Sequence, residues 1–188
     1  MKIKNVNVCG LRESIRRAKY PMSVNPDALN DTLTEGIRKL AVSESGMGHD
    51  QWLTGIVVQF DVTGSLKWWT EAQRYHFLDF ISSQSTMHRI CKFDIESQCN
   101  EYVRPEIINV TKRLAAQYNA DPTPENYLKV LYNIPTGFQL TAGMTTNYRQ
   151  LKTIYKQRKT HRLPEWREFC AWIETLPHAY LITGGEAE

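Results

Sequence analysis

The chain has 188 residues, which is enough for one domain with a sizeable hydrophobic core. Its apolar content of 41% and charged content of 23% are those of an ordinary globular protein. No run of about 18 apolar residues predicts a membrane span, and the net charge of +3 is too small to favour nucleic-acid binding on its own.

The four cysteines are scattered along the chain and form no Cys-x-x-Cys pair. A chain of this size needs no disulfide bond to fold, so we interpret them as reduced thiols of a cytoplasmic protein, with a disulfide pair as the alternative. The first ten residues lack the basic and apolar segments of a signal peptide. We expect a single domain over residues 1–183 and a short polar tail at 184–188.

The N-terminal third predicts two strands connected through short helices. Residues 2–8 alternate apolar and polar side chains imperfectly and predict a strand. Helical spacing predicts a helix over 11–20, which Pro21 stops, and another over 31–42. After a glycine-flanked loop, residues 56–62 alternate regularly and form the clearest strand of the chain.

The middle of the chain is mostly helical. Ser65 can cap a helix that runs to about Phe80. Further helices are predicted over 106–119 and 125–132, and a turn at 135–137 follows them.

The C-terminal part begins with a strand-like stretch over 138–144. Asn147 with Gln150 resembles a capping box for a helix that runs to Arg158. Pro164 begins the last predicted helix, which has a clean apolar face. Helices dominate and a few strands lie among them, so we predict an α+β fold: a mostly helical domain around a small central sheet.

One stretch of the helix after Ser65 is unusual. In a continuous helix Trp69, Gln73, His76 and Phe80 share one face. Burying Gln and His within an aromatic stripe costs free energy unless both are hydrogen-bonded. Either His76 is a satisfied core histidine or the two polar side chains reach a ligand.

The segment from Ser82 to Arg89 is polar at every position except Met87. It contains hydroxyl, amide and imidazole groups but no Gly, Pro or Asp, the residues that are common in surface loops. A ligand with many hydrogen-bonding groups, such as a nucleotide, suits this segment.

Basic residues gather near the C-terminus. Arg149 lies in the first turn of its predicted helix, where a positive charge opposes the helix dipole at a cost of a few tenths of a kcal/mol unless an anion is near. A phosphate would gain there from the helix N-terminus and the guanidinium together. The cluster is either a solvated helix face or a phosphate-binding surface. Its members are Arg149, Lys152, Lys156, Arg158, Lys159, Arg162 and Arg167.

Other chemistries find little support. The sequence contains no phosphate-binding loop, dinucleotide-binding glycine motif, zinc-protease motif or nucleophile-elbow motif. The five histidines show no convincing metal-ligand spacing, so no metal site is predicted. No cysteine has an activating neighbour in the sequence.

Taken in order, these segments resemble the flavin-dependent thymidylate synthase family. The family pattern H-x-T-P-F-E-H-x-x-F-T-F is matched at its first histidine, His49, and in the strand that ends at Phe60; its Glu-His pair is absent. The C-terminal pattern of the family is echoed by Asn147, Arg149 and Arg158, and by Glu165-Trp166-Arg167 after a one-residue gap.

The central family signature, Q-x-x-R-H-R-x-x-S-x-N-E-x-S-x-R-Y, aligns without gaps over residues 73–89. Gln73 is kept, Gln84 stands for the glutamate and Thr86 for the second serine. His76 and His88 stand where the family has nucleotide-facing arginines. The triplet R-H-R, which helps to hold the flavin in the family, reads His-Phe-Leu here.

The resemblance implies an enzyme that methylates C5 of dUMP, with methylene-tetrahydrofolate as carbon donor and NADPH-reduced FAD as hydride carrier, in a homotetramer with sites between subunits. It implies catalytic roles for Gln84 and Arg167. The implied nucleotide-binding residues are Gln73, His76, Thr86, His88, Arg149 and Arg167. The implied cofactor-binding residues are His49, Asn147 and Arg158.

Two other functions stay open at this point. The altered triplet favours a non-catalytic nucleotide-binding or interaction protein that kept the fold and lost FAD binding. The basic cluster and the tryptophans favour nucleic-acid binding, which we rank last.

Overall fold

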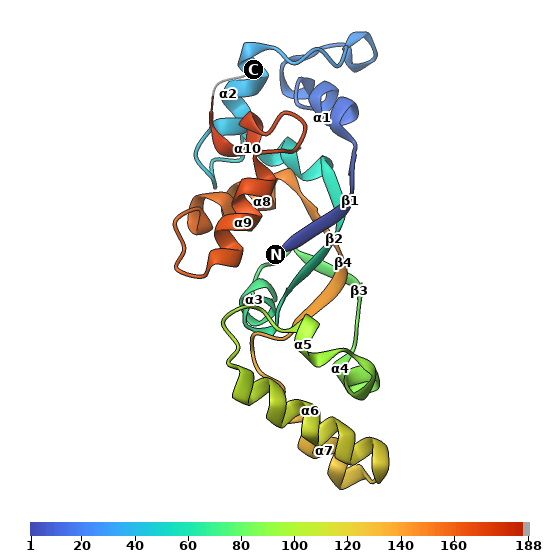
Figure 1. Cartoon of the computed structure of the whole chain (residues 1–188). Helices are drawn as coiled ribbons and strands as arrows, with labels where there is room; N and C mark the ends of the chain where they lie inside the picture. The colour runs from blue at the N-terminus through green and yellow to red at the C-terminus, as the bar shows by residue number, and fades with distance from the viewer. Residues whose placement is uncertain (186–188) are drawn as a thin grey trace.

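A four-stranded antiparallel sheet lies at the centre of the molecule, whose structure is a computed structural model that describes residues 1–185. The strand order is β1-β2-β4-β3. The strands span Lys2–Cys9 (β1), Val57–Ser65 (β2), Asp79–Ser83 (β3) and Gln139–Asn147 (β4). Helices lie at both ends of this sheet and along one of its faces (Figure 1).

The covered face of the sheet carries the main core. Alternate side chains of β2 point into it, and Val58, Phe60 and Val62 are at most 2% exposed. Three helices pack there: α3 (Leu66–Ala72), α8 (Tyr148–Arg158) and α9 (Pro164–Ile173). The rings of Trp68 and Phe169 meet at a centroid distance of 5.7 Å, and each such aromatic contact adds about 0.5–1.5 kcal/mol beyond its burial.

The N-terminal segment between β1 and β2 lies at one end of the sheet, together with α10 (Tyr180–Thr183) (Figure 1). Its α-helices are α1 (Leu11–Arg17) and α2 (Glu35–Val42), and its short 3-10 turns are η1 (Tyr20–Met22), η2 (Pro26–Ala28) and η3 (Gln51–Gly55). The short C-terminal helix α10 packs against α2 and α8. Gly184 and Gly185 are exposed, while the rest of the expected tail, 186–188, lies outside the described residues.

The opposite end of the molecule is a helical arm (Figure 1). It is formed by α6 (Pro105–Ala120) and α7 (Pro124–Leu131), with α4 (Thr86–Arg89), η4 (Ile90–Lys92) and α5 (Ile95–Gln98) at its base. A second, smaller core holds it, built around Ile90, Val130 and Phe138.

The predicted α+β class is confirmed, and so are most elements. The Asn147 side chain accepts a hydrogen bond from the Gln150 backbone N–H at 2.9 Å, as predicted for the cap of α8. α9 begins at Pro164, as predicted. Within the described residues no helix is long and apolar enough to cross a membrane.

The helix predicted to run from Ser65 to about Phe80 is wrong in its length. Ser65 does cap it, accepting from the Trp68 N–H at 3.1 Å, but α3 ends at Ala72. The chain then turns through Phe77, whose φ is +61°, into β3, where Phe80 pairs with Met144 of β4. The predicted single face of Trp69, Gln73, His76 and Phe80 therefore does not exist, because strand pairing overrides helical spacing here.

Candidate functional site

A buried carboxylate lies at the N-terminal end of α8. Asp50 is fully buried and directly precedes η3. Its two oxygens accept from two cations of α8: Arg149 Nε at 3.0 Å and Lys152 Nζ at 2.8 Å. Burial alone would raise the pKa of Asp50, but the hydrogen bonds and charges of Lys152 and Arg149 outweigh burial and lower that pKa. Asp50 is thus an ionised anchor that fixes two basic side chains.

A pocket of about 470 Å³ opens in front of this anchor, and we call it the α8 pocket. The N-terminal turn of α8 forms one wall, and η3 forms another. Its volume lies within the usual range for small-molecule sites. The lining residues are Ser45, Gln51, Thr54, Phe77, Asn147, Arg149, Gln150 and Thr153.

Arg149 is the cation of the α8 pocket. The side chain is 33% exposed. Within the described part of the chain, only Nε of its guanidinium is hydrogen-bonded, to Asp50. The sequence led us to expect an anion near Arg149, and Asp50 is such an anion within the protein itself. The remaining N–H groups of the guanidinium can donate to a second anion in the pocket. A phosphate at this position also meets the positive end of the α8 dipole.

Phe77 supplies an aromatic wall to the same pocket. Its side chain is 64% exposed although it is large and apolar. Its backbone has a φ of +61°, which costs a residue other than glycine about 1–3 kcal/mol and persists where the surroundings impose it. A strained, exposed aromatic ring in a pocket is suited to stacking on a planar ligand.

A second and larger pocket, of about 680 Å³, adjoins the first. We call it the Trp52 pocket. It shares Gln51 and Thr54 with the α8 pocket, so η3 stands between the two cavities. His49 and Arg17 line its polar part, and Leu40, Trp52 and Met22 are among its apolar lining. The structure thus brings three predicted site residues, His49, Asn147 and Arg149, to two adjoining pockets.

Apart from Phe77, the residues of the central signature lie outside the two pockets. Gln84 continues the pairing of β3 with β4: its backbone N–H donates to the Thr141 carbonyl, and its side-chain oxygen accepts from the Thr141 N–H, each at 2.9 Å. Gln73 is the C-terminal cap residue of α3. His76, Thr86 and His88 line neither of the two pockets.

Gln73, His76, Gln84 and His88 are exposed, while Thr86 is half-buried at the start of α4. Their exposure leaves them available to a ligand or to another chain. Their nucleotide-binding roles stay predictions.

Arg158 is held inside the protein. Its Nε donates to the Tyr75 hydroxyl at 2.6 Å, its Nη1 lies 3.3 Å from Glu71, and its guanidinium lies over the Trp166 ring at 4.9 Å. Arg158 therefore ties α8 to α3 and α9. It is nine residues after Arg149 on the same helix, or roughly 14 Å along the axis.

Arg167, at the start of α9, donates to the carbonyls of His161 and Arg162 at 2.6 and 3.0 Å. It steadies the loop between α8 and α9. Neither Arg158 nor Arg167 lines the α8 pocket, so the predicted joint grip of Arg149 and Arg167 on one phosphate has no counterpart within a single chain.

The segment that should hold a flavin by the family pattern fits poorly. Leu78, at the place of the second arginine, is 2% exposed and belongs to the core. Phe77 offers a ring but no charge, and only His76 retains a polar group. These three residues cannot grip a flavin dinucleotide as arginines would. Among residues 1–185, no cluster of His, Cys, Asp or Glu is arranged to hold a metal ion.

Sequence reasoning missed Asp50 and Phe77. One feature of the sequence could have pointed to Asp50. It is an acidic residue directly after the motif histidine, at the end of a glycine-flanked loop, and no lysine or arginine lies near it in the sequence. No such feature pointed to Phe77, because its position depends on the unpredicted strand β3.

Comparison with known proteins gives the fold. No protein-family model matches the sequence, and no curated protein sequence is similar to it. Two crystal structures of the flavin-dependent thymidylate synthase ThyX from Helicobacter pylori, both complexed with FAD and dUMP, are similar in structure.

The first of these structures has a TM-score of 0.76, over 98% of this chain and 99% of the other. The second has a TM-score of 0.78, over 98% of each chain. Both are 16% identical to this chain in sequence. The resemblance seen in the sequence is therefore confirmed at the level of the fold, over nearly the whole chain.

Proposed function

We propose that this chain is a divergent enzyme of the flavin-dependent thymidylate synthase type, which acts on a pyrimidine deoxynucleotide resembling dUMP by one-carbon transfer to C5. The observation that carries the proposal is the α8 pocket in a chain of this fold: an anchored arginine, a helix N-terminus and an aromatic ring line one cavity.

In this proposal the nucleotide phosphate binds Arg149. The guanidinium is held by Asp50, so little side-chain entropy is lost when it meets the phosphate. The amide of Gln51 and the hydroxyl of Thr54 stand on η3, within reach of the sugar and the base edge. The Phe77 ring stacks on the pyrimidine; contacts of this kind are worth about 1–3 kcal/mol.

The hydride source needs a binding site of its own. Residues 76–78 do not fit a flavin in the family manner, whereas His49 and the apolar wall of the Trp52 pocket offer a separate surface next to the nucleotide. We propose that any flavin lies there, with the exposed residues Gln73, His76 and His88 contributed from a neighbouring subunit of a homotetramer. NADPH and methylene-tetrahydrofolate would then act as substrates.

A second candidate function is favoured by the burial of Leu78. Leu78 is buried in the core at a position where the family binds flavin. This favours a protein that binds a nucleotide without redox chemistry. The same α8 pocket serves both candidates, so nucleotide binding and flavin binding need separate tests.

Nucleotide binding is tested by calorimetric titration of dUMP into the full chain. Arg149→Ala removes a charge-assisted contact worth roughly 1.5–3 kcal/mol, so affinity should fall about tenfold or more. Arg113→Ala, which removes an exposed arginine of α6 outside the pocket, is the matched control and should change affinity less than about twofold. Equal losses in the two variants would refute the phosphate site.

Flavin binding is tested by absorption spectroscopy of the purified protein after incubation with FAD and removal of free flavin. Retained flavin absorption that falls in His49→Ala supports the enzyme. A colourless protein that still binds dUMP supports the second candidate.

A further inference from the structure

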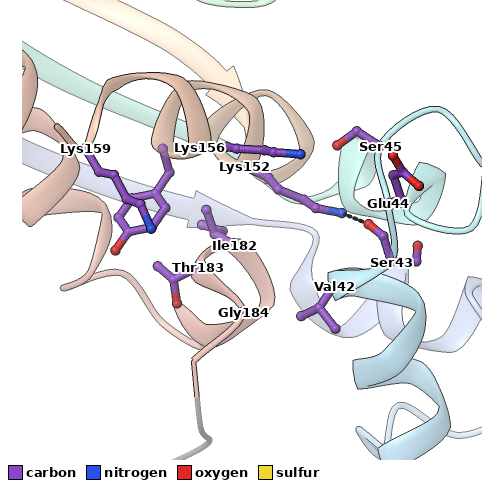
Figure 2. A pocket seen from close by; sticks show the side chains of 11 residues that line it. Val42, Ser43, Glu44, Ser45, Lys152, Lys156, Lys159, Ile182, Thr183 and Gly184 are labelled. Carbon is purple, nitrogen blue, oxygen red and sulfur yellow. Dashed lines mark hydrogen bonds between the residues drawn. The ribbon is translucent and has the colours of Figure 1, made fainter. Parts of the chain in front are cut away.

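A third cavity, of about 380 Å³, lies between α8, the segment from Ser43 to Ser45 and the end of α10 (Figure 2). We call it the lysine pocket. It is lined by Lys152 and Lys156 of α8 and by Lys159, the C-terminal cap residue of that helix. They are spaced four and three residues apart and hence lie on one side of the helix. Glu44 is the one carboxylate among its lining residues.

The three lysines are not equivalent. The Lys152 ammonium is fully used: it donates to Asp50, to the Ala41 carbonyl at 2.7 Å and to the Ser43 carbonyl at 2.6 Å. Within the described residues, neither Lys156 nor Lys159 makes an ion pair or a hydrogen bond through its ammonium group. As far as residues 1–185 show, these two ammonium groups have no partner in the pocket.

The surroundings of these two lysines suit an anion with an apolar body. In Figure 2 the Lys156 ammonium points toward Ser45, and Lys159 lies on the side of Thr183. The Lys159 ammonium is 5.6 Å from the centre of the Tyr155 ring, which keeps it at the pocket wall. Hydroxyl groups thus stand beside both cations, and Val42 and Ile182 supply apolar lining.

The dipole of α8 explains only part of this arrangement. Cations at the C-terminal end of a helix are favourable, which accounts for the charges of Lys156 in the last turn and of Lys159 at the cap. It does not account for a cavity in front of them, or for an apolar floor formed by α10 and the end of α2. Lysines four and three residues apart also repel one another by a few tenths of a kcal/mol, and a bound anion relieves this repulsion.

We propose that the lysine pocket is a second anion site, which binds a phosphate monoester whose apolar body packs on Val42 and Ile182. The phosphate is held by Lys156 and Lys159 and by the hydroxyl of Ser45. The site is separate from the α8 pocket, where Arg149 is the cation, and it does not depend on the proposed reaction.

The test uses phenyl phosphate as the probe, titrated into the full chain at pH 7 and low salt, and followed by calorimetry. Lys156→Gln/Lys159→Gln should weaken binding about tenfold or more, because two charge-assisted contacts are lost. The matched control is Lys4→Gln/Lys92→Gln, which removes the same charge from two exposed lysines elsewhere and should weaken binding less than about twofold.

Three further titrations complete the experiment. Inorganic phosphate should bind more weakly than phenyl phosphate and phenol should not bind, because the site needs both the anion and the apolar body. Arg149→Ala removes any phenyl phosphate binding at the α8 pocket, and the binding that remains should still fall about tenfold when Lys156→Gln/Lys159→Gln is added to it. Equal weakening in the two double variants, complete loss of phenyl phosphate binding in Arg149→Ala, or no binding to the wild type would each overturn the proposal.

Discussion

Replacing Asp50 with Asn tests whether the buried carboxylate anchors the α8 pocket. The substitution keeps the shape of the side chain and one acceptor oxygen, but it removes the charge that Arg149 and Lys152 share. Removing one partner of a fully buried ion pair costs about 3–5 kcal/mol. Because the Arg149 and Lys152 side chains are 33% and 12% exposed, water solvates them in part, and we expect a loss of about 3 kcal/mol.

For a chain of this length a loss of that size lowers the melting temperature by roughly 6–12 °C at pH 7, which calorimetry measures readily. The matched control is Asp79→Asn, which removes an exposed carboxylate at the start of β3 and should change stability by less than about 0.5 kcal/mol.

The dependence on pH provides an independent check. The pKa of Asp50 is lowered in the folded protein, so its contribution is fully present above the ordinary carboxyl pKa, roughly pH 4, and is lost as pH falls through the lower folded value. The difference between wild type and Asp50→Asn should thus be constant from pH 5 to 7 and shrink below about pH 4. A difference under about 1 kcal/mol at pH 7, or one that does not shrink in acid, would refute the anchor.

Other substitutions address single side chains. Phe77→Gly removes an exposed ring and a strained φ, so thermal melting should show stability equal to or above that of Phe77→Ala, while calorimetry shows both binding dUMP more weakly by about tenfold; a clearly less stable glycine variant would contradict the strain. Arg158→Ala should lower the free energy of unfolding by about 2 kcal/mol in denaturant titration, since it breaks the contacts with Tyr75 and Glu71; unchanged stability would contradict its role in joining α8 to α3 and α9. His49→Ala should stay within about 1 kcal/mol of the wild type, as expected for an exposed loop side chain, and a larger loss would make it structural. If His76 and His88 face the nucleotide, the double variant His76→Gln/His88→Gln should bind dUMP about tenfold more weakly at pH 7; unchanged affinity would remove them from the site.

Most elements of the fold could be predicted from local features of the sequence. The alternation along 56–62 correctly predicted which side chains of β2 face the core. The cap at Asn147 and the proline at 164 correctly predicted where α8 and α9 begin. β3 escaped prediction because it is a short edge strand in an aromatic, polar sequence. Its pairing with β4 decides its conformation, and that partner lies about 60 residues away. The same long-range pairing sets the position of Phe77.

The sequence predicted residues of the candidate site only where it still matches a motif of the family. His49, Asn147 and Arg149 were identified through family spacing, and they line two adjoining pockets. Arg158 also matched a spacing, yet a single chain encloses it among aromatic and acidic side chains. The role of Asp50 could not be inferred, because its partners are about 100 residues later and only the fold brings them together.

The most direct test of the proposed enzyme follows the hydrogen on C5 of the nucleotide. Carbon transfer to C5 replaces that hydrogen, so dUMP labelled with tritium at C5 should release the label into water when the protein is incubated with FAD, NADPH and methylene-tetrahydrofolate. The account predicts release above a protein-free control, lowered about tenfold or more at subsaturating dUMP by Arg149→Ala and unaffected by Arg113→Ala. No release from a protein that binds both dUMP and FAD would contradict it.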